Sequence, residues 1–363
     1  MTSKNTSCQP KKIELRLQFR KGAGIFIQNR SVKILENSRI KGKLLMAEMT
    51  IKELMRGVID LYHVGSYDLA YGLLTREGSH FPDNSTRIFY WRLCLAAKAG
   101  RYPLAISILK DALDTGIWYP AAQLQDDEDL RPLQDNPEFV NLVNLCKQRH
   151  AEAQANARPS LVTVQPENHP AGIETKIPLF IALHGDYNNA NQTIPYWKTL
   201  SEMGHLLAIP QSTQVGTAEG YIWDDFMLSE QEIIHHYKTL RKQYPIDPKR
   251  TLIGGFSLGG TLAIWLTLTR AIPAIGFIVI GPYLPKKFSW LPLIESCQDK
   301  KVRGYIIIGK QDTDCYQGAV TMANQLKAHD VPCELEIHPK LGHDFPPDFD
   351  QILSKAVRFL LAN

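Results

Sequence analysis

The feature that most constrains the fold is an alternation of short apolar runs with longer amphipathic segments after about residue 160. Runs that are apolar throughout predict strands buried on both faces of a sheet, and the segments between them predict helices. The expected strands are 161–164, 178–183, 206–209, 251–253, 276–280, 305–308 and 334–338, and the expected helices are 229–243, 258–270, 316–329 and 349–361. This order predicts an α/β fold with a mainly parallel sheet, helices on both faces and function at the carboxyl ends of the strands.

A G-x-S-x-G pattern, Gly255 to Gly259 with Ser257 at its centre, lies between the strand 251–253 and the helix that follows. The bare pattern arises by chance in roughly one chain in ten of this length, so its context decides its meaning. A strand, a sharp turn with serine at its apex and a helix together predict a nucleophile elbow. The helix onset also directs free N–H groups at any nearby oxyanion.

Polar groups also follow two later strands, so that a serine, an aspartate and a histidine occur in that order along the chain. Asp312 follows the strand 305–308, and His343 follows the strand 334–338. Parallel strands bring these ends to one edge of the sheet, so we expect both groups close to Ser257. Ser257 is then the nucleophile, His343 its base and Asp312 the group that orients the imidazole. Asp314 stays open as a rival for the role of Asp312.

With these residues in place, residues 160–363 resemble the α/β-hydrolase superfamily, near the phospholipase/carboxylesterase and dienelactone hydrolase-like esterases. Five ordered pieces carry the resemblance: Leu183-His184-Gly185, Trp223-Asp224, Gly254 to Gly260, Gly309-x-x-Asp312 and Gly342 to Phe345. The resemblance implies hydrolysis of carboxylic esters or thioesters through an acyl-enzyme, with no metal and no cofactor. True dienelactone hydrolases use cysteine where this chain has Ser257, which speaks against a dienelactone substrate.

The resemblance also implies an oxyanion hole and one wall of a substrate pocket. One backbone N–H would come from Leu258, and the second from Asp186 or Tyr187, in the loop after strand 178–183. We expect Tyr187 and Trp223 to contact substrate, and His184 to brace the loop. Among the other histidines, His338 is expected to be structural, and His235 and His236 are expected to be solvated on a helix.

Residues 50–150 have helical periodicity and contain an internal sequence repeat. Residues 65–74 align with residues 100–109 at an offset of 35, and each copy follows an apolar helix, at 51–64 and 87–99. This resembles a tetratricopeptide repeat (TPR), in which small residues and a Gly-x-Tyr turn let paired helices pack closely. A closing helix is expected to begin with Asn136 as its N-cap and Pro137 at its first position, for five or so helices in all.

These patterns predict three parts: a basic tail at 1–45, a TPR-like helical domain at 46–155 and an α/β-hydrolase domain at 160–363. The tail carries a charge of +9 and the rest of the chain −5. Three interpretations of the tail stay open: an arm for nucleic acid or an anionic surface, a solvated extension, or a chain that starts at Met46 or Met49. The helical domain would bind a protein partner, mediate self-association or pack as a layer.

Other features narrow the function classes. Six scattered cysteines without a CxxC pair predict reduced, mostly buried thiols. No stretch is long and apolar enough to span a membrane, and no secretory signal is visible, so we expect a soluble, cytoplasmic protein. The short connection between the strands 276–280 and 305–308 leaves no room for a large lid, which favours small or short-acyl esters. No nucleic acid is expected as a partner. The competing hypotheses are a helical-repeat adaptor with a non-catalytic hydrolase scaffold, and a serine peptidase.

Overall fold

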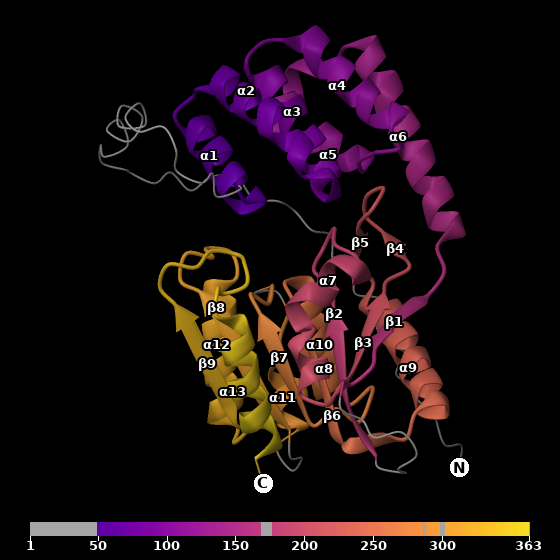
Figure 1. Ribbon diagram of the computed structural model, residues 1–363, viewed down its shortest axis with the longest axis vertical. Coiled ribbons are helices and arrows are strands. Elements are labelled where there is room, and N and C mark those ends of the chain that lie inside the picture. Colours follow the sequence, from indigo (N-terminus) through magenta and orange to yellow (C-terminus); the bar gives the residue numbers. More distant parts are fainter. Residues whose placement is uncertain (1–48, 168–175, 286–287, 298–301, 363) are drawn as a thin grey trace, which may run out of the picture. The chain divides into compact units, whose positions relative to one another are not determined.

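The computed structural model describes residues 49–167, 176–285, 288–297 and 302–362. The chain from residue 160 onward forms a seven-stranded sheet in the order β1-β3-β2-β6-β7-β8-β9 (Figure 1). Strand β1 is antiparallel to β3, and every other neighbouring pair in this sheet is parallel. The strands are β1 (Ser160–Val164), β2 (Ile177–Leu183), β3 (Leu206–Gln211), β6 (Ile246–Phe256), β7 (Gly276–Ile280), β8 (Arg303–Gly309) and β9 (Cys333–His338).

Both faces of the sheet are buried. Along β2, Leu179, Ile181 and Leu183 pack into one core, while Phe180 and Ala182 pack into another. Helices α9 (Phe226–Gln243), α10 (Leu258–Leu268), α11 (Leu291–Glu295) and α12 (Tyr316–Ala328) contribute to the first core, and α7 (Ala190–Trp197), α8 (Thr199–Glu202) and α13 (Phe349–Leu361) contribute to the second. The predicted α/β architecture with helices on both faces is therefore confirmed.

The sequence predictions located all seven strands of this sheet and four of its covering helices. The ranges 276–280 and 349–361 agree with β7 and α13 at both ends. Helices α7, α8 and α11 were not predicted, nor was the small antiparallel pair β4 (Gln214–Val215) and β5 (Tyr221–Ile222). Strand β6 begins five residues earlier than predicted, at Ile246.

The residues before β1 form helices, as expected. They are α1 (Ile51–His63), α2 (Tyr67–Glu77), α3 (Ser85–Lys98), α4 (Tyr102–Asp114), α5 (Ala121–Asp126) and α6 (Pro137–Asn156), with short 3-10 turns at Gly78–His80, Pro82–Asn84 and Glu128–Leu133. Contacts divide the described chain into two compact units, residues 49–111 with 128–135, and residues 112–127 with 136–362. The boundaries predicted at 46–155 and 160–363 stay predictions, and the basic tail at 1–45 lies outside the described residues.

The internal sequence repeat corresponds to two turns of the same conformation, each followed by a helix. Gly65 and Gly100 have φ of 75° and 74°, a left-handed conformation that glycine adopts without a steric penalty. After each glycine a helix begins, and Ala70 and Ala105 at matching positions are fully buried. The repeated sequence therefore encodes a repeated turn and packing position, while its relation to tetratricopeptide repeats stays a resemblance.

The predicted start of the last helix of this region is confirmed. The side chain of Asn136 accepts hydrogen bonds from the N–H groups of Glu138 (2.9 Å) and Phe139 (3.2 Å), and Pro137 is the first helical residue. The five cysteines in the described part of the chain, Cys94, Cys146, Cys297, Cys315 and Cys333, are all buried. Among the described helices, none combines the length and apolarity needed to cross a bilayer.

Candidate active site

Ser257 occupies the turn between β6 and α10. Its backbone has φ of 54° and ψ of −124°, which a residue with a Cβ rarely adopts and which costs on the order of 1–3 kcal/mol. The N–H of Ser257 donates to the carbonyl of Ile280 (3.0 Å), and its own carbonyl accepts from the N–H of Thr261 (3.1 Å). The strand, the serine and the helix therefore form the predicted elbow, held at the end of β7 and by the first turn of α10.

Two glycines make this turn possible. A Cβ on Gly255 would lie 2.5 Å from the backbone of Gly259, and a Cβ on Gly259 would overlap the carbonyl oxygen of His184. Real Cβ atoms do not approach backbone so closely, so both positions require glycine for the approach of β6, α10 and the loop after β2. The outer glycines of the G-x-S-x-G pattern thus bring the loop after β2 next to the serine.

His343 and Asp312 lie in line with the serine. His343 Nε2 is 2.9 Å from Ser257 Oγ, and His343 Nδ1 is 2.7 Å from Asp312 Oδ2. Asp312 follows β8 and its side chain is 3% exposed, whereas His343 follows β9 and its side chain is 39% exposed. The three residues predicted from separate strand ends are therefore joined by two consecutive hydrogen bonds.

Asp314, the alternative left open above, is exposed and makes no hydrogen bond with His343 in the described part of the chain. Asp312 is held in place by its neighbours instead. Its Oδ1 accepts the backbone N–H of Cys315 (3.2 Å), and its carbonyl accepts the N–H of Tyr316 (2.9 Å), at the start of α12.

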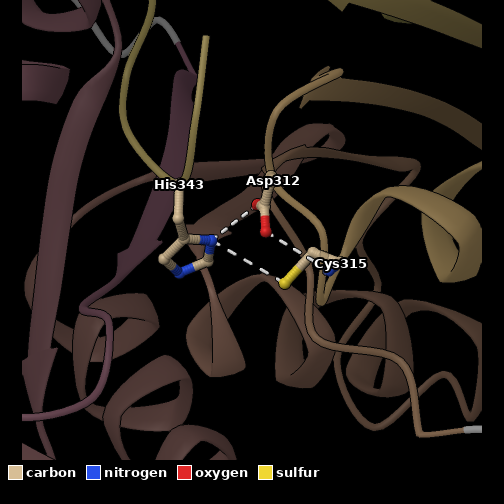
Figure 2. A group of neighbouring side chains, drawn as sticks. All are labelled: Asp312, Cys315 and His343. Carbon is tan, nitrogen blue, oxygen red and sulfur yellow. Dashed lines mark hydrogen bonds and ion pairs between the residues drawn. The ribbon is translucent and has the colours of Figure 1, made fainter. Parts of the chain in front are cut away.

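Two neighbours of the His343–Asp312 pair were not predicted. Gly281 has φ of 51°, and a Cβ there would lie 3.1 Å from His343 Nδ1 and 3.2 Å from Asp312 Oδ2. The buried thiol of Cys315 lies 3.7 Å from His343 Nδ1 (Figure 2). Gly281 directly follows the predicted strand 276–280, which is a usable signal for a close approach, but no sequence signal marks Cys315.

The loop after β2 is braced from within, as predicted for His184. This histidine is fully buried, with Nδ1 2.9 Å from the carbonyl of Gly185 and Nε2 accepting from the N–H of Ser212 (3.3 Å). Burial lowers the pKa of His184 to about 4, so the ring is neutral at pH 7. Trp223 stacks on His184 at 4.5 Å between ring centroids and donates its indole N–H to the His184 carbonyl (2.9 Å).

Trp223 therefore differs from the expectation of a substrate contact. Its side chain is 0% exposed, and it packs behind the loop. Tyr187, the second expected contact, is 42% exposed at the surface of the same loop. Among the remaining histidines, the prediction for His236 was wrong. It is buried on the inner side of α9, whereas His235 is exposed as expected and His338 ends β9.

Some backbone N–H groups around Ser257 are hydrogen-bonded within the protein and others are not. Tyr187 donates its N–H to the carbonyl of Tyr221 (2.8 Å). The N–H groups of Asp186 and Leu258 make no hydrogen bond in the part of the chain that the structure describes. Of the two loop donors considered from sequence, only Asp186 therefore has an N–H available to a ligand.

The carboxyl group of Asp186 lies in an unusual environment. Its Oδ1 atom is buried without a hydrogen-bond partner among the described residues. Burial, reinforced by the neighbouring Asp224 carboxyl, raises the pKa of Asp186 to about 7. The site thus holds a carboxyl group that changes its charge near neutral pH.

Comparisons with known proteins agree with this fold. Residues 220–361 match the phospholipase/carboxylesterase family, and residues 50–154 match the A/B hydrolase-like N-terminal domain. No curated protein matches the chain. A crystal structure of an uncharacterized protein from Bacillus cereus ATCC 10987 is 32% identical, with a TM-score of 0.50, and the match covers 86% of this chain and 99% of that chain.

Two more distant solved structures are also similar. Esterase PE8 is 16% identical over 56% of this chain and 99% of that chain, with a TM-score of 0.47. FphF, a fluorophosphonate-binding serine hydrolase from Staphylococcus aureus, is 19% identical over 56% of this chain and 92% of that chain, with a TM-score of 0.43. The Bacillus relative matches over most of its length, so the helical region and the sheet region occur together in both chains. Residues 220–361 therefore belong to the phospholipase/carboxylesterase family of α/β-hydrolases, and the chain is an esterase.

Proposed function

We propose that the protein hydrolyses carboxylic esters or thioesters of small or short-acyl substrates through an acyl-enzyme on Ser257. The observation that carries the proposal is the hydrogen-bonded chain from Ser257 Oγ to His343 Nε2 (2.9 Å) and from His343 Nδ1 to Asp312 Oδ2 (2.7 Å). A serine hydroxyl is a poor nucleophile at neutral pH, and this geometry supplies the base that it needs.

In the acylation half, Ser257 Oγ attacks the carbonyl carbon while its proton passes to His343 Nε2. Asp312 accepts the Nδ1–H and stabilises the imidazolium. The tetrahedral oxyanion accepts hydrogen bonds from the N–H groups of Leu258 and Asp186. Each such donor contributes about 3–4 kcal/mol to transition-state stabilisation. His343 then returns the proton to the leaving alcohol or thiol, and the acyl group stays on Ser257.

In the deacylation half, a water molecule attacks the acyl carbon and gives its proton to His343 Nε2. The same two N–H groups bind the second oxyanion. When this intermediate collapses, the proton returns to Ser257 Oγ and the carboxylic acid leaves. The partly exposed ring of His343 supports this half, because water has to reach the face of the acyl-enzyme next to Nε2.

The preference for small substrates is supported by the connection between β7 and β8. In its described part, this segment contains only α11, a helix of five residues, as an ordered element. Tyr187, exposed at the loop after β2, is the side chain that we expect to contact the substrate. The substrate is then a small ester that reaches Ser257 without the movement of a large lid.

A substrate panel with a burst measurement tests the proposal. Aryl esters carry a good leaving group and acylate the enzyme fast, so deacylation becomes the slower step. They should therefore give a rapid burst of leaving group equal to the enzyme concentration, followed by slower turnover. Ser257→Ala should lower turnover by roughly 10⁴–10⁶-fold with the fold intact, whereas Ser296→Ala, an exposed serine on α11's C-terminal side, should change nothing. Faster cleavage of aminoacyl amides than of matched esters would instead indicate a peptidase, and full turnover by Ser257→Ala would refute the mechanism.

A further inference from the structure

The thiol of Cys315 lies next to the hydrogen-bonded pair of His343 and Asp312. Cys315 stands at the start of α12 with its side chain 2% exposed, and its Sγ lies 3.7 Å from His343 Nδ1. Its backbone N–H donates to Asp312 Oδ1, so the thiol and the carboxylate are fixed relative to each other. Figure 2 shows the sulfur of Cys315 and the carboxylate of Asp312 side by side, with a dashed line from each to Nδ1 of His343. The mechanism above uses two of these groups and leaves the thiol without a role.

The three groups form a donor set that suits a soft divalent cation. Cysteine sulfur, imidazole nitrogen and carboxylate oxygen are the protein ligands of Zn²⁺. Tetrahedral zinc sites separate such ligand atoms by roughly 3.3–3.8 Å, given bonds of about 2.0–2.3 Å. Here one ligand atom from each of Asp312, Cys315 and His343 lies within 4.8 Å of the others. The sulfur-to-nitrogen distance already fits, and the nitrogen-to-oxygen distance of 2.7 Å has to open by about half an ångström.

We propose that Asp312, Cys315 and His343 form an inhibitory site for a soft divalent cation such as Zn²⁺. The cation takes the position between the ring and the carboxylate, with the fourth ligand position left to water. The thiol of Cys315 loses its proton to solvent as the metal–sulfur bond forms. His343 keeps one ring proton, but that proton moves from Nδ1 to Nε2 because Nδ1 now binds the metal. Binding therefore releases one proton in total.

The consequence for Ser257 follows from the tautomer. With its proton on Nε2, His343 donates to Ser257 Oγ and cannot accept the serine proton. The base is lost while the nucleophile stays in place, so hydrolysis stops until the metal leaves. The inhibition rests on the proposed role of His343 as base, whereas the binding of the metal does not. In the absence of metal, burial raises the pKa of the Cys315 thiol, so the sulfur stays protonated and inert.

The experiment uses the full chain and two metal ions as probes. Zn²⁺ is titrated into an ester hydrolysis assay, followed by EDTA. We expect inhibition of the wild type that EDTA reverses, and inhibition constants higher by at least about 10–100-fold in Cys315→Ala and Cys315→Ser, each compared with its own metal-free rate. Cys333→Ala removes another buried thiol, at the start of β9, and should keep the wild-type inhibition constant.

Binding is measured separately from activity. Cd²⁺ bound to cysteine sulfur gives an ultraviolet thiolate absorption, which should appear in the wild type and in Ser257→Ala but not in Cys315→Ala. Since Ser257→Ala has no esterase mechanism to inhibit, its absorption tests the site even if the proposed function fails. The site is refuted if Ser257→Ala gives no thiolate absorption, if the absorption persists in Cys315→Ala, or if Zn²⁺ inhibits Cys315→Ala and the wild type at the same concentration.

Discussion

Replacement of Asp312 by asparagine should abolish the base function of His343 through a single, predictable change of orientation. In the wild type, Asp312 Oδ1 accepts the backbone N–H of Cys315 (3.2 Å) and Oδ2 accepts His343 Nδ1–H (2.7 Å). Asparagine has one oxygen and one NH₂ group in place of the two oxygens. The Cys315 N–H can only donate, so the amide oxygen stays there and the NH₂ group faces His343.

The magnitude follows from the tautomer that this orientation imposes. Because the NH₂ group of the asparagine donates to His343 Nδ1, Nδ1 has to be the acceptor of that hydrogen bond. The ring proton of His343 therefore moves to Nε2, the atom next to Ser257. The reverse orientation would oppose two donors in a buried site, at a cost of about 1–3 kcal/mol, so the neighbours cannot restore the original tautomer cheaply. A triad aspartate replaced in this way loses about 10⁴ in kcat, equivalent to about 5.4 kcal/mol of transition-state stabilisation.

The assay is steady-state hydrolysis of an aryl ester by Asp312→Asn, with Asp314→Asn as the matched control. Asp314 is exposed two residues away, so its replacement should leave kcat within a factor of two or so, an expectation that follows from its position at the surface. Circular dichroism and thermal unfolding verify that both variants fold. A loss of kcat in Asp314→Asn, or a loss smaller than roughly tenfold in Asp312→Asn, would refute the assignment.

Substitutions at three other positions test the surroundings of the site and the stability of the fold. Gly281→Ala places a Cβ at 3.1 Å from His343 Nδ1 in a backbone with φ of 51°. The free energy of unfolding, measured in urea, should therefore fall by about 1–2 kcal/mol, and kcat should fall more than KM changes. An unchanged kcat would contradict the close approach. Asn136→Ala removes both cap hydrogen bonds of α6 and should cost about 1 kcal/mol in urea unfolding, with Asn136→Ser losing less; equal stability of all three proteins would contradict the cap. The folded pKa of Asp186 is raised to about 7, so the folded protein retains a proton that the unfolded chain releases, and stability falls as pH rises from about 4 to 7. Asp186→Asn should flatten this part of the Tm–pH profile, and parallel profiles for both proteins would contradict the assignment.

The parts of the fold that the sequence predicts well are those whose local pattern and tertiary environment agree. Strand β7 is apolar throughout and buried on both faces, so its limits at Gly276 and Ile280 are visible in the sequence. The amphipathic pattern of α13 marks its limits in the same way. Ser257, Asp312 and His343 could be placed because each follows a strand of this readable kind, and parallel strands share one functional edge.

The misses have physical reasons. Helix α7 contains Pro195 and is only eight residues long, so its helical signal is weak. Strand β6 extends back to Ile246 through Asp247, Pro248, Lys249 and Arg250, a run with the composition of a turn. Tertiary context overrides the pattern in both segments.

Close approaches between distant segments are harder still to predict. Gly281 and Cys315 approach His343 from separate strand ends. The glycine after the strand 276–280 signals a close approach without saying to which group, and no local pattern marks Cys315. His236 illustrates the same limit, because two adjacent histidines on α9 point about 100° apart around the helix axis. Which of them is buried depends on the face of α9 that packs into the core, and here that residue is His236. Sequence therefore predicts which groups reach the edge, and the structure supplies what surrounds them.

The central claim is that Ser257 is the nucleophile activated by His343. The most direct measurement treats the folded chain with a fluorophosphonate and locates the adduct by peptide mass spectrometry, because this reagent phosphonylates a serine only when a base activates it. We predict one adduct per chain, on Ser257, abolished in Ser257→Ala and strongly slowed in Asp312→Asn. A folded wild type that stays unlabelled, or that carries its adduct on another residue, would contradict the account.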